Sequence, residues 1–296
     1  MQSLAQKSVV DEATLKELQE TELNILRAFS TYCKNNGLTY YLIGGALLGT
    51  ARYKKFIPWD NDIDVAMFRE DYEKFQRLWN EKPLEGFFLQ SAKTDHLFSR
   101  CILKLRMDKT HIIEKACAGI EMHDGIYIDI FPIDYVNHLY TREMNFRAWR
   151  IRKLMTLRTI KAGYNSDRYK IFKRIIKLLL VFAKSSTIDD QIERLCTKEN
   201  HGTKKYGVLY LHNYPWRKQI HPIEIFGTGT YSEFCGMRVC IPKNTDAFLR
   251  KVFGDDYMEE PPVEKQKQPH NYLEIQIDRD VLNEMKYGER NLTGNG

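Results

Sequence analysis

The chain has 296 residues and a net charge of +6 at pH 7, with 43% hydrophobic, 28% charged and 12% aromatic residues. That length suits one large domain or two modest ones, and the aromatic content argues against a disordered chain. The longest apolar run, IIKLLLVFA at residues 175–183, is interrupted by Lys177 and is too short to span a bilayer. The polar N-terminal stretch has no secretory signal, so we expect a soluble or peripheral cytoplasmic protein.

The six cysteines exclude two common kinds of site. None of them forms a C-x-x-C pair, so their spacing does not fit a zinc finger. The chain is also too long to need a disulfide framework. We therefore predict reduced thiols.

The first 140 residues predict a mixed α/β region in which helices and strands alternate. Asp11 caps a helix whose apolar positions recur at spacings of three, four and seven residues, and Gly37 ends it. Pro132 is expected to end the regular part of the last strand. The expected strands are residues 39–44, 62–68, 86–92, 99–114 and 125–136, and the expected later helices are residues 46–53 and 69–79.

The second half predicts a mostly helical region with a small β element. Between Arg147 and Lys184 it holds twelve Lys and Arg and a single acid, Asp167. Such a block favours contact with an anionic membrane surface, and the alternative is a core helix with a solvated basic face. No RNA-binding signature accompanies the charge, so we expect no nucleic-acid partner. The predicted organisation is a catalytic core at residues 1–140 and a basic, acceptor-side region at residues 141–296 that completes the active site.

Three carboxylates at alternate positions suggest a metal site. In the segment DNDIDVAMF, an extended strand would place Asp60, Asp62 and Asp64 on one face. Carboxylates held this close repel one another unless a cation neutralises them. Mg²⁺, bound by one or two carboxylates and by phosphate oxygens of a substrate, is the usual solution.

A glycine pair precedes these carboxylates and suggests a phosphate site. Gly44 and Gly45 lie where a buried strand is expected to turn into a helix, so that their N–H groups can approach an anion. Arg52, Lys54 and Lys55 lie between the glycines and the carboxylates and could bind phosphate charge. Neither the glycine pair nor the D-x-D pattern is specific alone, but together they favour a functional site.

The stretch LIGGALLGTARYKKFIPWDNDIDV resembles the signature of LicD-type phosphotransferases, which belong to the nucleotidyltransferase superfamily and are similar to the fukutin-related proteins. Two further stretches support the resemblance, DGIYIDIFPIDYV and VFGDDYMEEPPVEKQKQPH. In that superfamily a Gly-Gly or Gly-Ser turn precedes a strand with two aspartates, and a third carboxylate lies on a neighbouring strand. The resemblance therefore implies a nucleotidyltransferase-like mixed sheet with flanking helices.

The resemblance also implies the roles of individual residues. Asp129 is the preferred third carboxylate, because a charged side chain inside the β-branched run IYIDIF is rarely there for packing. Asp134 ranks second, and Asp124 is also within reach. The implied catalytic and metal-binding residues are Asp62, Asp64 and Asp129, and the implied donor-binding residues are Gly44, Gly45, Gly49, Arg52, Trp59, Asp60, Lys265 and His270.

The activity implied is Mg²⁺-dependent phosphoryl transfer, with one or two ions and with Mn²⁺ as an alternative. The implied donor is CDP-linked, with CDP-choline first and CDP-glycerol or CDP-ribitol as alternatives. The acceptor would be a hydroxyl of a cell-surface glycan or of a teichoic-acid precursor, free or lipid-linked. Trp59, Tyr53 and Trp216 are candidates for holding a quaternary ammonium by cation–π contact, and His212 is a further candidate at the site.

Other classes stay open at this point. A D-x-D glycosyltransferase would use a nucleotide sugar, and an RNA-directed nucleotidyltransferase would extend RNA. A binding module without activity would have no need to keep a row of repelling carboxylates.

Overall fold

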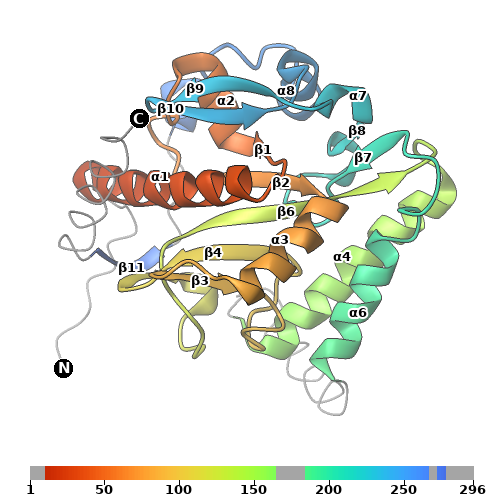
Figure 1. The fold of residues 1–296 in the computed structure, drawn as a ribbon, viewed down its shortest axis with the longest axis horizontal. Coiled ribbons are helices and arrows are strands. Elements are labelled where there is room, and N and C mark those ends of the chain that lie inside the picture. Colours follow the sequence, from red (N-terminus) through yellow and green to blue (C-terminus); the bar gives the residue numbers. More distant parts are fainter. Residues whose placement is uncertain (1–10, 165–183, 267–271, 278–296) are drawn as a thin grey trace.

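The computed structural model describes residues 11–164, 184–266 and 272–277 of the chain (Figure 1). Its fold is a mixed α/β arrangement of a curled sheet with helices around it, which confirms the predicted fold class. The helices are α1 (Glu12–Asn35), α2 (Gly44–Tyr53), α3 (Arg69–Glu81), α4 (Arg142–Ala162), α6 (Ser185–Cys196), α7 (Ile223–Phe226) and α8 (Thr245–Phe253). The strands are β1 (Tyr41–Ile43), β2 (Asp64–Phe68), β3 (Phe87–Gln90), β4 (Leu103–Met107), β5 (Thr110–Glu114), β6 (Tyr127–Val136), β7 (Tyr206–Val208), β8 (Ile220–Pro222), β9 (Thr230–Phe234), β10 (Met237–Ile241) and β11 (Tyr272–Ile277).

The main sheet is organised around β6, whose residues are all buried. The strand order is β1-β2-β6-β4-β3, and β7 pairs with the far end of β6 and with β8. The pair β2–β6 is parallel, so both strands begin at the same edge of the sheet. That shared edge carries the first residue of β2, Asp64, beside its register partner in β6, Asp129.

The prediction that Pro132 ends the regular structure is wrong, because β6 continues to Val136. The N–H of Asp129 donates to the carbonyl of Ile63 on the β2 side, so by alternation the Pro132 nitrogen faces the opposite side. On that side the pairing with β4 reaches only Ile130, and the pairing with β7 begins at residue 134. The proline therefore occupies a gap between two partners, where no N–H is needed.

Helix α1 lies across the sheet and covers β6 and β4 (Figure 1). Its predicted apolar stripe is confirmed, since these positions are buried, and the Asp11 side chain caps the helix by accepting from the Thr14 N–H. Three polar side chains, Thr21, Glu22 and Asn24, are also buried on this helix. The stripe comprises Leu15, Leu18, Ile25, Leu26, Phe29 and Tyr32.

The second half contributes strands to the first. β7 and β8 extend the main sheet, the β9–β10 hairpin packs beside β1, and β11 pairs with β5. The division of the chain at residue 140 stays a prediction. The apolar run at residues 175–183 and the acid Asp167 lie outside the described residues. Within the described ranges, no helix is long and apolar enough to cross a membrane, and the six cysteines form no disulfide.

One buried histidine predicts an acid-sensitive stability. His221 on β8 stacks on Phe248, and burial together with nearby Lys251 lowers the pKa of His221 to about 3. As the pH falls through the unfolded-state value of 6.5, the unfolded chain takes up a proton that the folded chain refuses. This residue should therefore cost about 2 kcal/mol of stability between about pH 7 and about pH 5.

We expect His221→Phe to remove that loss, because phenylalanine keeps the stacking and does not titrate. The measurement is denaturant unfolding of both proteins at the two pH values. An equal loss of stability in the variant and the parent would contradict the assignment.

Candidate functional site

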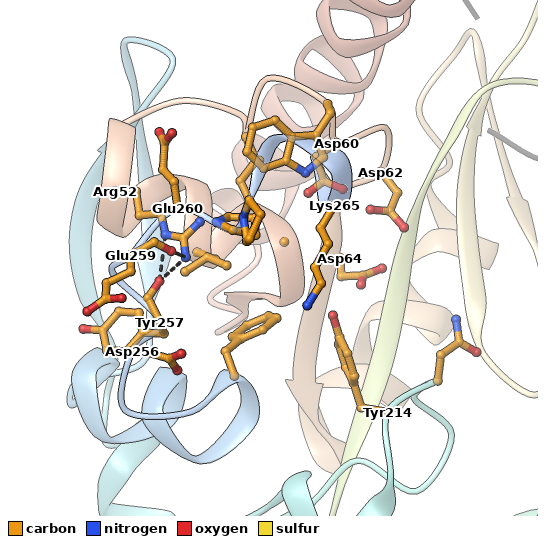
Figure 2. Close-up of a pocket in the computed structure, with 18 of the residues that line it drawn as sticks. Arg52, Asp60, Asp62, Asp64, Tyr214, Asp256, Tyr257, Glu259, Glu260 and Lys265 are labelled. Carbon is orange, nitrogen blue, oxygen red and sulfur yellow. Dashed lines mark hydrogen bonds between the residues drawn. The ribbon is translucent and has the colours of Figure 1, made fainter. Parts of the chain in front are cut away.

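A cavity of about 690 Å³ opens beside the start of β2 (Figure 2). Its walls come from four parts of the chain: α2, the loop before β2, the segment 212–214 and the segment 253–265. The lining residues are Gly45, Leu48, Arg52, Ile57, Trp59, Asp60, Asp62, Asp64, His212, Asn213, Tyr214, Phe253, Asp256, Tyr257, Glu259, Glu260, Pro261, Pro262 and Lys265.

All three predicted carboxylates line this cavity, although the predicted strand is wrong at its start. β2 begins at Asp64, and Asp60 and Asp62 lie in the preceding loop. That loop is held in place by a turn from the Asp60 N–H to the Ile57 carbonyl and by the Gln19 amide of α1, which donates to the Asp60 carbonyl at 2.7 Å. The three side chains thus converge from a fixed loop and a strand end rather than from one face of a strand.

The carboxylates are strained electrostatically. Burial and the charge of Asp64 raise the pKa of Asp60 to about 7. Burial, followed by the charges of Asp64 and Asp60, raises the pKa of Asp62 well above its ordinary value. Because the charge of Asp64 disfavours ionisation of Asp60 and Asp62, a bound cation would stabilise the group.

The two glycines make room for these carboxylates. Helix α2 begins at Gly44, whose φ is +61°, and a Cβ on this residue would lie 2.8 Å from Asp64 Oδ2. A Cβ on Gly45 would lie 2.0 Å from Asp60 Oδ2. Two side-chain carboxylates therefore rest against the first turn of α2, where the helix dipole favours negative charge.

Two other predicted donor-binding residues make contacts within the protein. Gly49 does not line the cavity, and a Cβ there would lie 2.5 Å from the Lys55 carbonyl, so this glycine allows the following loop to pack on α2. Arg52 lines the cavity, but its guanidinium donates to the carbonyls of Tyr257 and Glu259. These bonds, drawn in Figure 2, fix the C-terminal wall of the cavity to α2.

The remaining donor-binding candidates differ in their placement. Trp59 and Lys265 line the cavity, and Figure 2 shows the Lys265 side chain extending toward Asp64 and Tyr214. Tyr53 donates to Glu260 at the rim, and Trp216 lies beside Tyr210 and Tyr140 instead. Neither Tyr53 nor Trp216 is a lining residue, and His270 lies outside the described residues.

Asp129 lies beside Asp64 but is buried behind the cavity. Lys104 Nζ lies 3.2 Å from Asp129 Oδ1, and Arg100 lies 3.9 Å from Oδ2. Burial raises the pKa of Asp129 against the opposing effect of these two cations, and burial lowers the pKa of Lys104 to about 8. Asp129 is thus a buried carboxylate with cations on one side and Asp64 on the other.

The two alternatives to Asp129 are engaged elsewhere. Asp134 forms a buried two-pronged salt bridge with Arg69, with both N–O distances at 2.8 Å. Asp124 pairs with His111 at 2.9 Å on the surface. Only Asp129, of the three, is the register partner of Asp64.

The segment 212–214 completes the wall opposite α2. His212 Nε2 lies 3.3 Å from Asp64 Oδ2, and the His212 ring stacks on Tyr214. Arg152 of α4 donates to the carbonyls of His212 at 2.6 Å and of Tyr214 at 2.9 Å. The candidate His212 therefore lines the site, held by a helix from the basic region.

Sequence reasoning missed several residues around the carboxylates. Glu22 of α1 is buried, and burial followed by the charge of Asp62 raises its pKa well above the ordinary value. Asn61 donates to the Tyr272 hydroxyl of β11 at 2.6 Å, which ties the loop to the far end of the chain. A signal for Glu22 existed, because it is a charged residue on the apolar stripe of a helix.

The residues fit a magnesium ion in their chemistry. Among the described residues, no three His, Cys, Asp or Glu side chains are already arranged to hold a metal. However, within the described part of the chain Asp60 Oδ2 is buried without a hydrogen-bond partner, and Asp129 Oδ1 has an ion pair with Lys104. A cluster of carboxylate oxygens with unused acceptor capacity is the donor set that Mg²⁺ prefers.

Comparison with known proteins identifies the family of the chain. Residues 37–156 match the family described as LicD/FKTN/FKRP, nucleotidyltransferase domain. The chain is 30% identical over 272 residues to the lipopolysaccharide cholinephosphotransferase LicD of Haemophilus influenzae, covering 89% of this chain and 98% of that protein. It is 36% identical over 78 residues to the human ribitol 5-phosphate transferase FKRP, covering 21% of this chain and 16% of that protein. The chain belongs to the LicD family.

Proposed function

We propose that this LicD-family chain is a Mg²⁺-dependent phosphotransferase that moves phosphocholine from CDP-choline onto a hydroxyl of a cell-surface glycan or a teichoic-acid precursor. The observation that carries the proposal is the charge of the cavity. Among the described residues that line it, six are carboxylates and two, Arg52 and Lys265, are Lys or Arg. Such a cavity repels a free phosphate, so a phosphate-bearing donor needs cations to enter it.

One source of positive charge is the metal. Asp62, Asp64 and Asp129 would hold it, with Asp60 beside them, and Mn²⁺ is an alternative to Mg²⁺. When bound, the ion neutralises phosphate charge and favours ionisation of an attacking hydroxyl. Whether one or two ions bind stays a prediction.

The other source of positive charge is the donor itself. Three carboxylates, Asp256, Glu259 and Glu260, form the rim of the cavity on the side away from Asp60, Asp62 and Asp64 (Figure 2). Aromatic rings line the same cavity. A trimethylammonium group is attracted both by carboxylates and by the faces of aromatic rings. A neutral polyol such as ribitol gains neither interaction. The aromatic lining residues are Trp59, Tyr214, Phe253 and Tyr257.

The transfer then follows from the two ends of the cavity. In this proposal the rim binds choline, and Lys265, together with an ion held by the aspartates, would bind the two phosphates. The acceptor oxygen forms a bond to the phosphorus that carries choline, and the bridge to CMP breaks. A carboxylate of this aspartate cluster accepts the proton of the acceptor hydroxyl. The chain's own contribution is to position the donor and to take up that proton.

The test is a thermal-shift panel of CDP-choline, CDP-glycerol, CDP-ribitol and a UDP-sugar, with and without Mg²⁺. We expect a Mg²⁺-dependent rise with CDP-choline of about 5 °C at a hundredfold excess over Kd. Glu260→Gln and Trp59→Ala should weaken the binding of CDP-choline more than the binding of CDP-glycerol. A shift only with the UDP-sugar would move the assignment to a D-x-D glycosyltransferase.

A second candidate is phosphoribitol or phosphoglycerol transfer. The similarity to FKRP favours it, although that similarity covers only 21% of the chain. A larger shift with CDP-ribitol than with CDP-choline would establish this alternative. A cytoplasmic location stays a prediction.

A further inference from the structure

Within the described residues, half of the exposed large apolar side chains lie in one short stretch. Of the eight large hydrophobic side chains that are exposed in the described residues, four lie between residues 139 and 149. On α4, Phe146 is 58% exposed and Trp149 is 54% exposed, and their rings stack with centroids 5.6 Å apart. Paired aromatic rings in water at the surface of a helix call for an explanation.

Helix α4 buries Met144, Ala148 and Ile151, as a surface helix usually does, but it also buries two arginines. Its inner side buries Arg147, which pairs with Glu199. It also buries Arg158, which pairs with Asp189 and donates to the carbonyls of His96 and Phe98. A surface helix usually turns apolar residues inward and arginines outward. Two arginines of α4 thus form ion pairs inside the protein, whereas its two aromatic rings are exposed.

The outer side of α4 is also basic. Arg150 lies over the Phe146 ring at 6.0 Å, and Lys153 lies over the Trp149 ring at 5.9 Å. Arg142 is exposed on the same side, one turn before Phe146. The only acid within α4 is Glu143, which pairs with Lys198 of the segment after α6.

We propose that this α4 outer face, formed by Arg142, Phe146, Trp149, Arg150 and Lys153, docks on a bilayer surface that contains anionic lipid. Aromatic rings of this kind favour the headgroup level, and lysines and arginines beside them are attracted by anionic headgroups. α4 would lie parallel to the bilayer with its rings inserted. The charge of the face selects an anionic surface over a neutral one.

Hydrogen bonds connect the helix that carries the docking face to the wall of the cavity. Arg152, on the flank of the same helix, donates to the carbonyls of His212 and Tyr214, and both of these residues line the cavity. Helix α4 therefore lies between a membrane bound to its outer face and the cavity wall formed by residues 212–214. In relation to the proposed function, on which this step rests, docking would bring the cavity to an acceptor anchored in lipid.

The experiment is co-sedimentation of the full chain with phosphatidylcholine vesicles that do or do not contain phosphatidylglycerol. We expect binding to the anionic vesicles, weaker binding at high salt, and little binding to phosphatidylcholine alone. Arg150→Gln and Lys153→Gln should each lower the partition coefficient about fivefold. Trp149→Ala with Phe146→Ala should lower it at least as much as the two charge changes together.

Tyr231→Ala is the matched control. Tyr231 is an exposed aromatic residue on β9 with Arg238 at 4.1 Å from its ring, which reproduces the aromatic–cation pairing on another surface. This variant should bind vesicles as the parent does. Circular dichroism and thermal unfolding of every variant would establish that α4 is still folded.

Three results would overturn the proposal: no binding of the parent to anionic vesicles, equal binding to neutral vesicles, or full binding by the α4 variants. A change of oligomeric state in Trp149→Ala, without a change in vesicle binding, would identify the face as a protein interface instead. The Mg²⁺-dependent thermal shift with CDP-choline is measured separately on the same variants. Absence of that shift in the parent would refute the proposed function and would leave the vesicle result unaffected.

Discussion

Asp64→Asn is expected to lower the rate of phosphocholine transfer at least about a hundredfold, which exceeds what is usual for residues that only support a metal ligand. Asp64 begins β2, lines the cavity and has Asp129 as its register partner. Asparagine keeps the size of the side chain and removes the charge that a cation would neutralise. Asp62→Asn should behave in the same way. The measurement is release of CMP from CDP-choline in the presence of acceptor and Mg²⁺.

The same substitution should not weaken the fold in the absence of divalent ions. Since Asp60 and Asp62 both owe part of their raised pKa to the charge of Asp64, removing that charge relieves repulsion. Denaturant unfolding in EDTA should therefore show equal or greater stability for Asp64→Asn. Glu233→Gln, an exposed carboxylate on β9 outside this cavity, is the control for loss of one negative charge. Near-normal turnover by Asp64→Asn would refute the metal-site assignment.

The second large effect is expected from adding one methyl group at Gly45. The new Cβ would lie 2.0 Å from Asp60 Oδ2 and 2.9 Å from Asp60 Cγ, so the carboxylate must move. The backbone of Asp60 cannot follow easily, because both its N–H and its carbonyl are hydrogen-bonded. A displacement of this order at a catalytic site costs about a hundredfold in rate. We expect Gly45→Ala to lose activity to that extent, although alanine is otherwise the better helix residue.

Gly44→Ala and Gly37→Ala form a matched pair that separates backbone strain from crowding of the site. Both glycines have φ near +60°, so alanine is strained at both positions by about 1–2 kcal/mol. A Cβ at Gly37 meets nothing within 4 Å, whereas one at Gly44 approaches Asp64. Both variants should lose stability in thermal unfolding, and only Gly44→Ala should lose transfer activity. Equal activity of the two would show that the glycine pair is needed for the turn alone.

Features that depend on local pattern could be predicted from the sequence. The apolar stripe of α1 follows helical periodicity, and its buried positions are those expected. Asp129 could be picked out because a charge inside a β-branched strand is costly, and the structure gives it Asp64 as a register partner. The roles of these aspartates in catalysis stay predictions.

Features that depend on distant contacts could not be predicted in this way. The tolerance of β6 for Pro132 arises only because two other strands leave a gap there. Arg52 has the appearance of a phosphate ligand in the sequence, and its carbonyl partners at Tyr257 and Glu259 lie some two hundred residues away, as the separations of 205 and 207 positions show. The burial of Arg147 and Arg158 on α4 depends likewise on acids outside the helix, Glu199 and Asp189.

The pairing of β11 with β5 has a consequence for the order in which the protein matures on the ribosome. The loop that carries the carboxylates is tied to β11 through Asn61 and Tyr272, and β11 pairs with a strand from the first half. Synthesis runs from the N-terminus, so the early strands must wait for residues 272–277 before this part of the site is closed. Contacts so distant in sequence also slow folding. In a nascent chain, Asn61 of the carboxylate loop therefore lacks its Tyr272 partner until residues 272–277 have been translated.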